Sequence, residues 1–513
     1  MIKNVSRTWK IILAVLAVLV LLYVVVKLYV HQKIDSLLTD SAISSYQIAY
    51  SDISTSLFAG NLALRDVTIT GKKDRTSNHS FTADQIEING VQILKALTGT
   101  SLSMEEVVVH GFDLNYSMLR PKSNDSNNKQ SKNFDRSIAI NRFSVRNGNV
   151  TIERDSLERP WIKSYINDLN IKNIKIDSTS LNATLPFTYN TLDLDIDSTS
   201  VTISPYDQLT FNALKLNADS ITLNNAAFKT IVSPQEIYDR FGMERDIFDV
   251  EFPSIAVKEY DLKFNAEMPE FTATDIILNK PIINVYRNKL IKDNPKKRAM
   301  YSELLRNLPI HLNIGDVTLK DGYIAYAEKR IEANGPATLF LTNMNATIAG
   351  VNTFPAEKSQ IDIDATTLLM GSGDVDAQWS FDIFDERDNF TFRADVKHLN
   401  LESISPFIRN LFNITAKGNI NQLYFSIYGD QDSSTTDVKI DYTGMDIQVL
   451  GSDGDENTIK TLLGNLLVAG DTTSNSGSFD NVKATSQRDK QKSFFNYIWI
   501  SLRAALKESM TIF

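Results

Sequence analysis

The amino-acid sequence predicts a mostly β protein with an N-terminal transmembrane helix and a long, curved, repeat-like antiparallel β-sheet. We expect this sheet to form an open groove with few short helices and to be followed by a C-terminal amphipathic helix. Three observations predict this class. An apolar run opens the chain, period-two alternation fills most of the remainder, and one strand-like unit recurs.

The composition is that of a folded protein and excludes several functions. The chain has 513 residues, of which 42% are hydrophobic and 22% are charged, so widespread disorder is not expected. Its net charge of -9 argues against nucleic acid as a partner, because nucleic-acid binders normally carry a basic face. The absence of cysteine excludes disulfides and cysteine-bound metals.

The first thirty residues predict a membrane anchor. Residues 1–10 form a basic tail, and the apolar run from Ile11 to Val30 contains one charge, Lys27. Twenty helical residues span about 30 Å, the thickness of the hydrocarbon layer, whereas a cleaved signal peptide has an apolar core of about 7–15 residues. The positive flank places the N-terminus in the cytoplasm and the bulk of the chain on the other side of the membrane.

The chain after the predicted anchor, which we call the exported body, is predicted to consist mainly of strands. After a short helix over residues 31–41, apolar residues alternate with polar ones, as in Leu192, Leu194 and Ile196 between aspartates. Turn residues interrupt these runs about every ten residues, which is typical of all-β proteins. We divide the body into an N-terminal β region, 31–300, and a C-terminal β region, 301–468.

One strand unit recurs and contains a phase slip. "LALRDVTI" (62–69) returns as "LNIGDVTL" (312–319), with looser copies at 169–176 and 271–278. In an extended chain Leu62 and Leu64 share one face, while Val67 and Ile69 fall on the other. A bulge near Arg65 and Asp66 that inserts one residue would reunite them, and a tight turn is the alternative.

Helices are predicted at 233–249, 294–308 and 457–468. Two polar segments, 120–136 and 469–492, are predicted to be mobile, the second as a tether.

The last segment, 493–513, is predicted to form an amphipathic helix. Aromatic residues beside basic ones suit a membrane interface, and a helix that caps the end of the sheet is the alternative. The predicted interface residues are Phe495, Ile498, Trp499, Leu502 and Leu506.

The sequence contains no recognisable active site. Its five histidines are scattered singly, and it lacks a nucleophile elbow, a phosphate-binding glycine loop and a zinc-protease helix. The row Asp193, Asp195 and Asp197 could imitate a catalytic or calcium-binding cluster, but a solvated strand face explains it equally well. We therefore predict a protein that is not an enzyme and uses no metal or cofactor.

Both ends of the exported body resemble one family. Residues 31–69 run from the anchor through a short helix into "G-x-L-x-L-x-x-V-x-I", matched by Gly60, Leu62, Leu64, Val67 and Ile69. Residues 396–450 contain "G-x-I-x-x-L-x-F", and residues 314–329 look like a further strand pair. These segments resemble the AsmA-like family, which shares its architecture with chorein-type bridge proteins.

The resemblance implies a bacterial protein anchored in the inner membrane, with a periplasmic groove that serves phospholipid movement and outer-membrane integrity. Acyl chains would slide passively along the apolar face, and other envelope proteins would be further partners. The rival interpretations are a scaffold of closed β-sandwich domains and an exported carbohydrate-active enzyme. The predicted lining residues are Leu62, Leu64, Val67, Ile69, Leu192, Leu194, Ile196, Leu423, Phe425 and Ile427.

Overall fold

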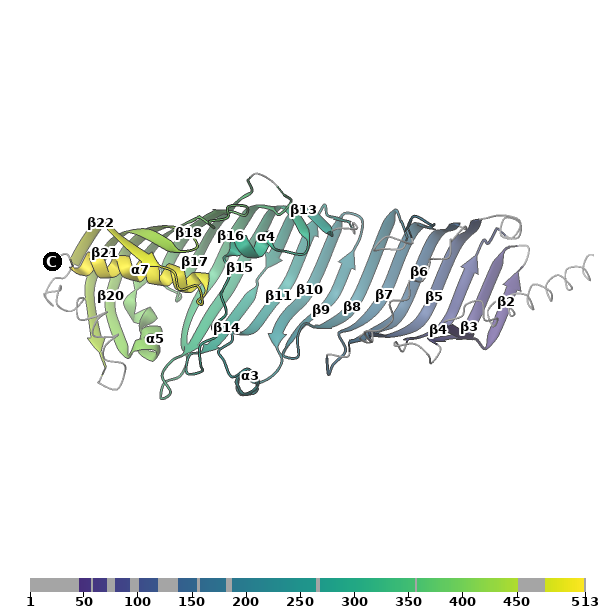
Figure 1. Cartoon of the computed structure of the whole chain (residues 1–513), viewed down its shortest axis with the longest axis horizontal. Coiled ribbons are helices and arrows are strands. Elements are labelled where there is room, and N and C mark those ends of the chain that lie inside the picture. The colour runs from purple at the N-terminus through teal and green to yellow at the C-terminus, as the bar shows by residue number, and fades with distance from the viewer. Residues whose placement is uncertain are drawn as a thin grey trace, which may run out of the picture. The chain divides into compact units, whose positions relative to one another are not determined.

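The computed structural model describes residues 46–56, 59–71, 79–92, 101–118, 137–154, 157–180, 187–263, 268–355, 358–450 and 476–511. The predicted anchor at 11–30 and the helices at 31–41 and 457–468 lie outside these residues, as does the polar segment 120–136. No helix among the described residues combines the length and apolarity needed to span a bilayer. The described chain is mostly strand, and its 22 strands belong to one mixed sheet (Figure 1).

Contacts divide the described residues into two compact units. Unit 1 comprises those up to Pro205 together with Asn212–Ala218, and unit 2 comprises Tyr206–Phe211 and those from Asp219 onward. Strand β9 (Asp207–Leu216) contributes to both. The other strands of unit 1 are β1 (Tyr46–Ala49), β2 (Asp52–Ser56), β3 (Asn61–Gly71), β4 (His79–Asn89), β5 (Ser101–Met118), β6 (Ser137–Arg154), β7 (Ile162–Ile176) and β8 (Thr191–Thr202).

Unit 2 holds the remaining strands and the four described helices. Its strands are β10 (Ser220–Thr230), β11 (Ile247–Lys258), β12 (Asp261–Lys263), β13 (Glu270–Asn279), β14 (Ile282–Asn288), β15 (His311–Lys329), β16 (Ala337–Asn352), β17 (Gln360–Leu369), β18 (Gly373–Asp382), β19 (Phe390–Asn400), β20 (Ile414–Gly429), β21 (Ser433–Val449) and β22 (Ser476–Gln487). Its helices are α3 (Pro234–Phe241), α4 (Tyr301–Arg306), α5 (Leu401–Phe412) and α7 (Phe494–Thr511).

Two sequence predictions need correction. The sheet is not wholly antiparallel, because β5 pairs with β6 in parallel, as do β13 and β14 with β15. Parallel neighbours require a long connection, and the segments between these strands supply it. The tether predicted over 469–492 contains strand β22, since pairing with β21 satisfies its backbone despite its polar side chains.

The predicted helices and the C-terminal amphipathic helix are found in part. Helix α3 begins as its sequence indicates, with the Ser233 side chain capping the amide of Glu236 and proline in the first turn. Helices α3 and α4 are shorter than predicted. Helix α7 matches the predicted C-terminal helix closely.

The phase slip in β3 is real, but its cause is neither an inserted residue nor a turn. Leu64 and Val67 are both buried, at 7% and 1% exposure, with two exposed residues between them. The register with β4 is unbroken, since Arg65 pairs with Gln85 and Val67 with Ala83. Asp66 instead adopts a left-handed φ of 48°, which reverses the alternation within one continuous strand.

Strands β4–β7 carry the same slip at the same level, and from β3 to β7 the register is unbroken, whereas the pairing of β7 with β8 is irregular between Tyr165 and Asp168. Gly111 in β5 has a φ of 57° and Asn147 in β6 a φ of 53°, and the pairs around them stay in register. A side chain on Gly111 would meet the Asp84 carboxylate at 1.9 Å, so glycine avoids both this overlap and the strain of a left-handed φ. These residues form one kink line across the sheet of unit 1.

A second kink line runs parallel to the first, and the sequence repeat marks both. Gly60, Gly90 and Asn173 all have left-handed φ values. Asn173 occupies in "LNIKNIKI" the place that Asp66 occupies in "LALRDVTI", and Ile171 and Ile174 on either side are buried like Leu64 and Val67. In this pair of copies the recurring unit therefore encodes a kink.

We predict that Asp66 is sensitive to side-chain shape. Asp66→Val should lower the free energy of unfolding by about 1–2 kcal/mol, because a β-branched residue resists a left-handed φ. Asp66→Asn should be nearly neutral. Urea titration checks both, with Thr68→Val, at a position without a left-handed φ in the same strand, as the control. Equal losses of unfolding free energy for Asp66→Val and Thr68→Val would contradict the role of Asp66 in the kink.

Candidate functional site: an apolar sheet face in unit 1

The kink lines keep apolar side chains on one face of strands β3–β8. Residues opposite one another in a sheet point to the same side, so the strand register groups them into rows. Three rows cross all six strands. They are Leu62, Ile88, Val107, Phe143, Ile171 and Leu192; Leu64, Ile86, Val109, Val145, Leu169 and Leu194; and Val67, Ala83, Phe112, Gly148, Ile166 and Ile196. We call this surface the apolar face.

The apolar face brings together all seven lining residues predicted in this part of the chain. Leu62, Leu64 and Val67 lie at its β3 side, and Ile69 continues it in a further row with Phe81 and Leu114. Leu192, Leu194 and Ile196 lie at its β8 side. The two groups are separated by more than 100 residues in sequence and belong to the same rows.

Among the described residues, the apolar face is one layer thick. Every described helix belongs to unit 2, and strands β1–β8 of unit 1 all pair edge to edge within the one sheet, so no other described element of unit 1 forms a second layer. The central residues Ala83, Val109, Phe112 and Val145 bury one another, while Leu62, Leu192 and Leu194 remain half-exposed. The rows combine buried side chains such as Leu64, Val67 and Ile171 with partly exposed ones, and the exposed parts form an apolar surface able to take up an apolar ligand.

The opposite face of the same strands is polar. Asp193 pairs with Asn170, and the Asp195 carboxylate accepts a hydrogen bond from Asn167 at 3.1 Å and lies 3.5 Å from Lys215. The aspartate row is thus a solvated strand face. In the part of the chain that the structure describes, no three acidic, histidine or cysteine side chains gather to hold a metal ion.

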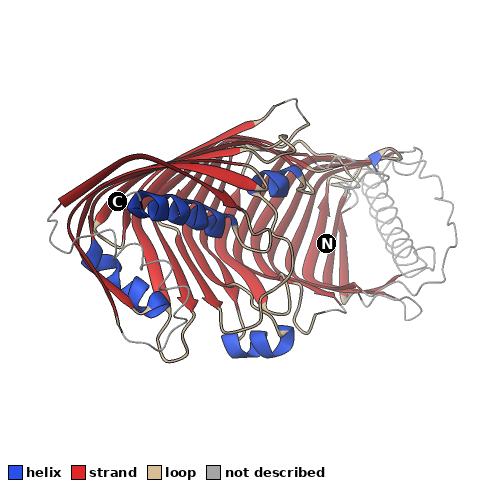
Figure 2. Ribbon diagram, turned by 60° about the vertical axis from the view of Figure 1, so that its left-hand side comes forward, coloured by secondary structure: helices blue, strands red, loops and turns tan. Residues whose placement is uncertain are grey.

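The three predicted lining residues of β20 have different surroundings. Leu423, Phe425 and Ile427 are buried in the main core of unit 2, and Ile427 is fully inaccessible. Helices α5 and α7 pack against this sheet (Figure 2). These side chains therefore contribute to the packed core of unit 2.

Helix α7 packs against strands β20–β22, in the manner of a capping helix. Its buried face comprises Phe494, Tyr497, Ile498, Ser501 and Ala505. Of the predicted interface residues, Ile498 thus faces the core, and Leu502 and Leu506 pack partly against it. Phe495 and Trp499 remain exposed.

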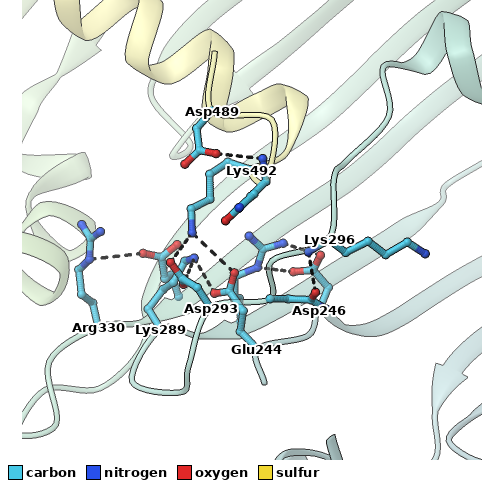
Figure 3. A network of polar contacts seen from close by, with 12 residues as sticks. Glu244, Asp246, Lys289, Asp293, Lys296, Arg330, Asp489 and Lys492 are labelled. Atoms are coloured by element: carbon cyan, nitrogen blue, oxygen red, sulfur yellow. Dashed lines mark hydrogen bonds and ion pairs between the residues drawn. The ribbon is translucent and has the colours of Figure 1, made fainter. Parts of the chain in front are cut away.

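A charged cluster holds the start of α7 to the body of unit 2 (Figure 3). It comprises Glu244, Asp246, Arg287, Lys289, Asp293 and Lys492. The Lys492 ammonium, two residues before α7, lies 2.6 Å from Asp293 and 3.9 Å from Glu244. Lys289 contacts the same two carboxylates at 3.5 Å and 2.5 Å.

The charged cluster also changes the pKa of one of its carboxyl groups, Asp293. The hydrogen bond from Lys492 is the main reason that the pKa of Asp293 lies below its ordinary 3.8. Because the pKa of Asp293 is lower in the folded chain than its ordinary value, the pair of Asp293 and Lys492 stabilises the fold at pH values above that ordinary pKa. The contribution is lost as the pH falls through the folded pKa.

Asp246 is the residue of this cluster whose removal should cost most. It binds buried Arg287 through two hydrogen bonds of 2.6 Å and 2.5 Å. Asp246→Ala would leave a buried, unpaired guanidinium and should destabilise the fold by about 3–5 kcal/mol. The exposed pair of Asp261 and Lys263 is the control, where Asp261→Ala should have little effect on stability because water screens the pair.

Chemical denaturation of these variants measures both effects. The double variant Asp246→Leu with Arg287→Met should recover most of the loss, because no buried charge is left unpaired. A loss at Asp246 no larger than that at Asp261 would show that the buried pair has little importance.

The sequence interpretation missed the middle of the apolar face, in β4–β7. The signal was present in β5, where Leu102 and Met104, Val107 and Val109, and Phe112 and Leu114 form pairs that recur every five residues. Such spacing is expected of a strand with a regular phase slip, and a search for strict period-two alternation overlooks it.

Comparisons with known proteins add no relative. A scan against models of protein families finds no match to this chain, and a search of curated proteins finds none either. The functional argument therefore depends on the apolar face itself.

Proposed function

We propose that this chain is a lipid-binding and lipid-transfer protein of the bacterial envelope, similar to the AsmA-like family, which carries phospholipid acyl chains on the apolar face of unit 1. One observation supports this most: three rows of mainly aliphatic and aromatic side chains cross strands β3–β8, and every other described element of unit 1 pairs laterally in the same sheet. A closed sandwich would require a second sheet over these rows.

The proposed mechanism is passive. An acyl chain that lies along the rows avoids exposing its methylene groups to water, at about 0.8 kcal/mol for each CH₂. Head groups would remain at the edge of the face, in water. No covalent chemistry is involved, which agrees with the lack of catalytic motifs in the sequence, and we propose no enzymatic activity.

The rest of the proposal concerns location and partners. The apolar run at 11–30 would anchor the chain in the inner membrane, with its bulk in the periplasm. The role would be to support phospholipid transport and outer-membrane integrity, with other envelope proteins as further partners.

Photo-crosslinking tests the proposed site. A photoreactive amino acid at Ile88, on the apolar face, should crosslink phospholipid in cells, whereas the same group at Glu87, on the opposite face, should not. Both side chains are half-buried and adjacent in β4, so their accessibility is matched. Equal labelling at the two positions, or none at Ile88, would refute lipid binding at this face.

A further inference from the structure

Helices α4 and α7 expose an apolar patch in unit 2. Four large apolar side chains are unusually exposed: Tyr301 at 39% and Leu304 at 53% on α4, with Phe495 at 59% and Trp499 at 43% on α7. The rings of Tyr301 and Phe495 are 6.3 Å apart, so the two helices present a continuous surface. Both helices lie on the same side of the sheet of unit 2 (Figure 1). We call these four residues the α4–α7 patch.

A basic segment borders this patch. Residues 289–298, which lead toward α4, contain five basic residues and one acid. Two hydrogen bonds hold the segment beside the start of α7: the Arg298 backbone N–H donates to the Lys490 carbonyl at 2.8 Å, and the Arg488 guanidinium donates to the Arg298 carbonyl. The same charged cluster that anchors Lys492 therefore also positions these lysines.

Two of these lysines are available to a partner. Lys292 and Lys296 are exposed, and within the described part of the chain neither forms an ion pair. The Lys296 side chain extends away from the charged cluster (Figure 3). Arg503, on the solvent side of α7, adds a third exposed cation. In a chain of net charge -9, this is a local concentration of positive charge.

Exposed tyrosine, tryptophan and phenylalanine beside lysines are the features of a surface that lies in a bilayer interface. The aromatic rings occupy the head-group level, and each lysine near an anionic membrane strengthens binding. We propose that the α4–α7 patch and its basic border dock unit 2 onto the surface of an anionic phospholipid bilayer. This goes beyond the lipid-carrying site, because it concerns a second membrane contact that does not involve the apolar face of unit 1.

Vesicle docking by the full-length chain tests this proposal. The chain is held in phosphatidylcholine nanodiscs and mixed with separate, sedimentable vesicles that contain phosphatidylglycerol. Co-sedimentation should be strong with these vesicles, weak with pure phosphatidylcholine vesicles, and reduced by salt. Lys292→Glu with Lys296→Glu should weaken it about tenfold, and Phe495→Ser with Trp499→Ser should weaken it comparably.

The control makes the same charge change elsewhere. Lys163→Glu with Lys172→Glu reverses two exposed lysines of unit 1 and should leave docking unchanged. Circular dichroism confirms that every variant is folded. Equal docking by the patch variants and the wild type, or equal docking to both vesicle types, would overturn the proposal.

The two proposals fail separately. Loss of crosslinking at Ile88 with docking intact would refute only the lipid-carrying site, and loss of selective docking with crosslinking intact would refute only the docking surface.

Discussion

Phe494→Ala is expected to lower the free energy of unfolding of unit 2 by about 3–5 kcal/mol, whereas Phe495→Ala should cost less than about 1 kcal/mol. These neighbours lie on different sides of α7, at 3% and 59% exposure. The Phe494 ring stacks on Trp379 with centroids 4.6 Å apart and meets Phe390 edge-on at 5.0 Å. Truncation removes these contacts and leaves a cavity.

Urea unfolding followed by tryptophan fluorescence measures the difference, because Trp379 reports directly on the site of Phe494. The two variants remove the same atoms from adjacent positions of one helix, so helix propensity and composition are matched. Similar losses for both would mean that α7 does not pack on the sheet in the observed orientation.

Leu192→Gln with Leu194→Gln is expected to lower the phospholipid bound per chain at least severalfold, with little effect on folding. These side chains are half-exposed on the apolar face, so glutamine costs little in the empty protein but places polar groups against an acyl chain. Mass spectrometry of the lipid that co-purifies with the exported body measures the effect.

The matched control lies in the same strand. Asp193→Asn with Asp195→Asn changes alternate residues of β8, which face the polar side of the sheet. Lipid content should then stay at the wild-type level. If the wild-type exported body carries no lipid, or if both double variants lose equal amounts of lipid, lipid binding at the apolar face would be contradicted.

Local patterns in the sequence predicted most of the secondary structure. Alternation in "LDLDID" places leucine and aspartate on opposite faces of β8, because side chains in a strand alternate whatever the strand packs against. The phase slip in "LALRDVTI" indicated a real distortion at Asp66. The amphipathic pattern at 493–513 predicted α7. All of these follow from the geometry of a few consecutive residues.

The cause of the phase slip could not be read from one strand. A single strand with reversed alternation suggests a bulge, because a bulge is the usual local solution. The structure instead places left-handed residues at one level of the sheet, at Asp66 in β3, Gly111 in β5 and Asn147 in β6. That alignment depends on strand register, including a parallel pair that the sequence interpretation did not foresee.

The sequence by itself therefore determined which side chains are apolar, where strands alternate and slip, and that a C-terminal helix has two unlike faces. Only the tertiary structure decided which apolar residues are covered. Leu194 and Leu423 stand in similar strand patterns, yet Leu194 is half-exposed and Leu423 lies in a core. The physical reason is that alternation arises within one strand, whereas cover depends on contacts between distant segments, such as that of Lys492 with Asp293.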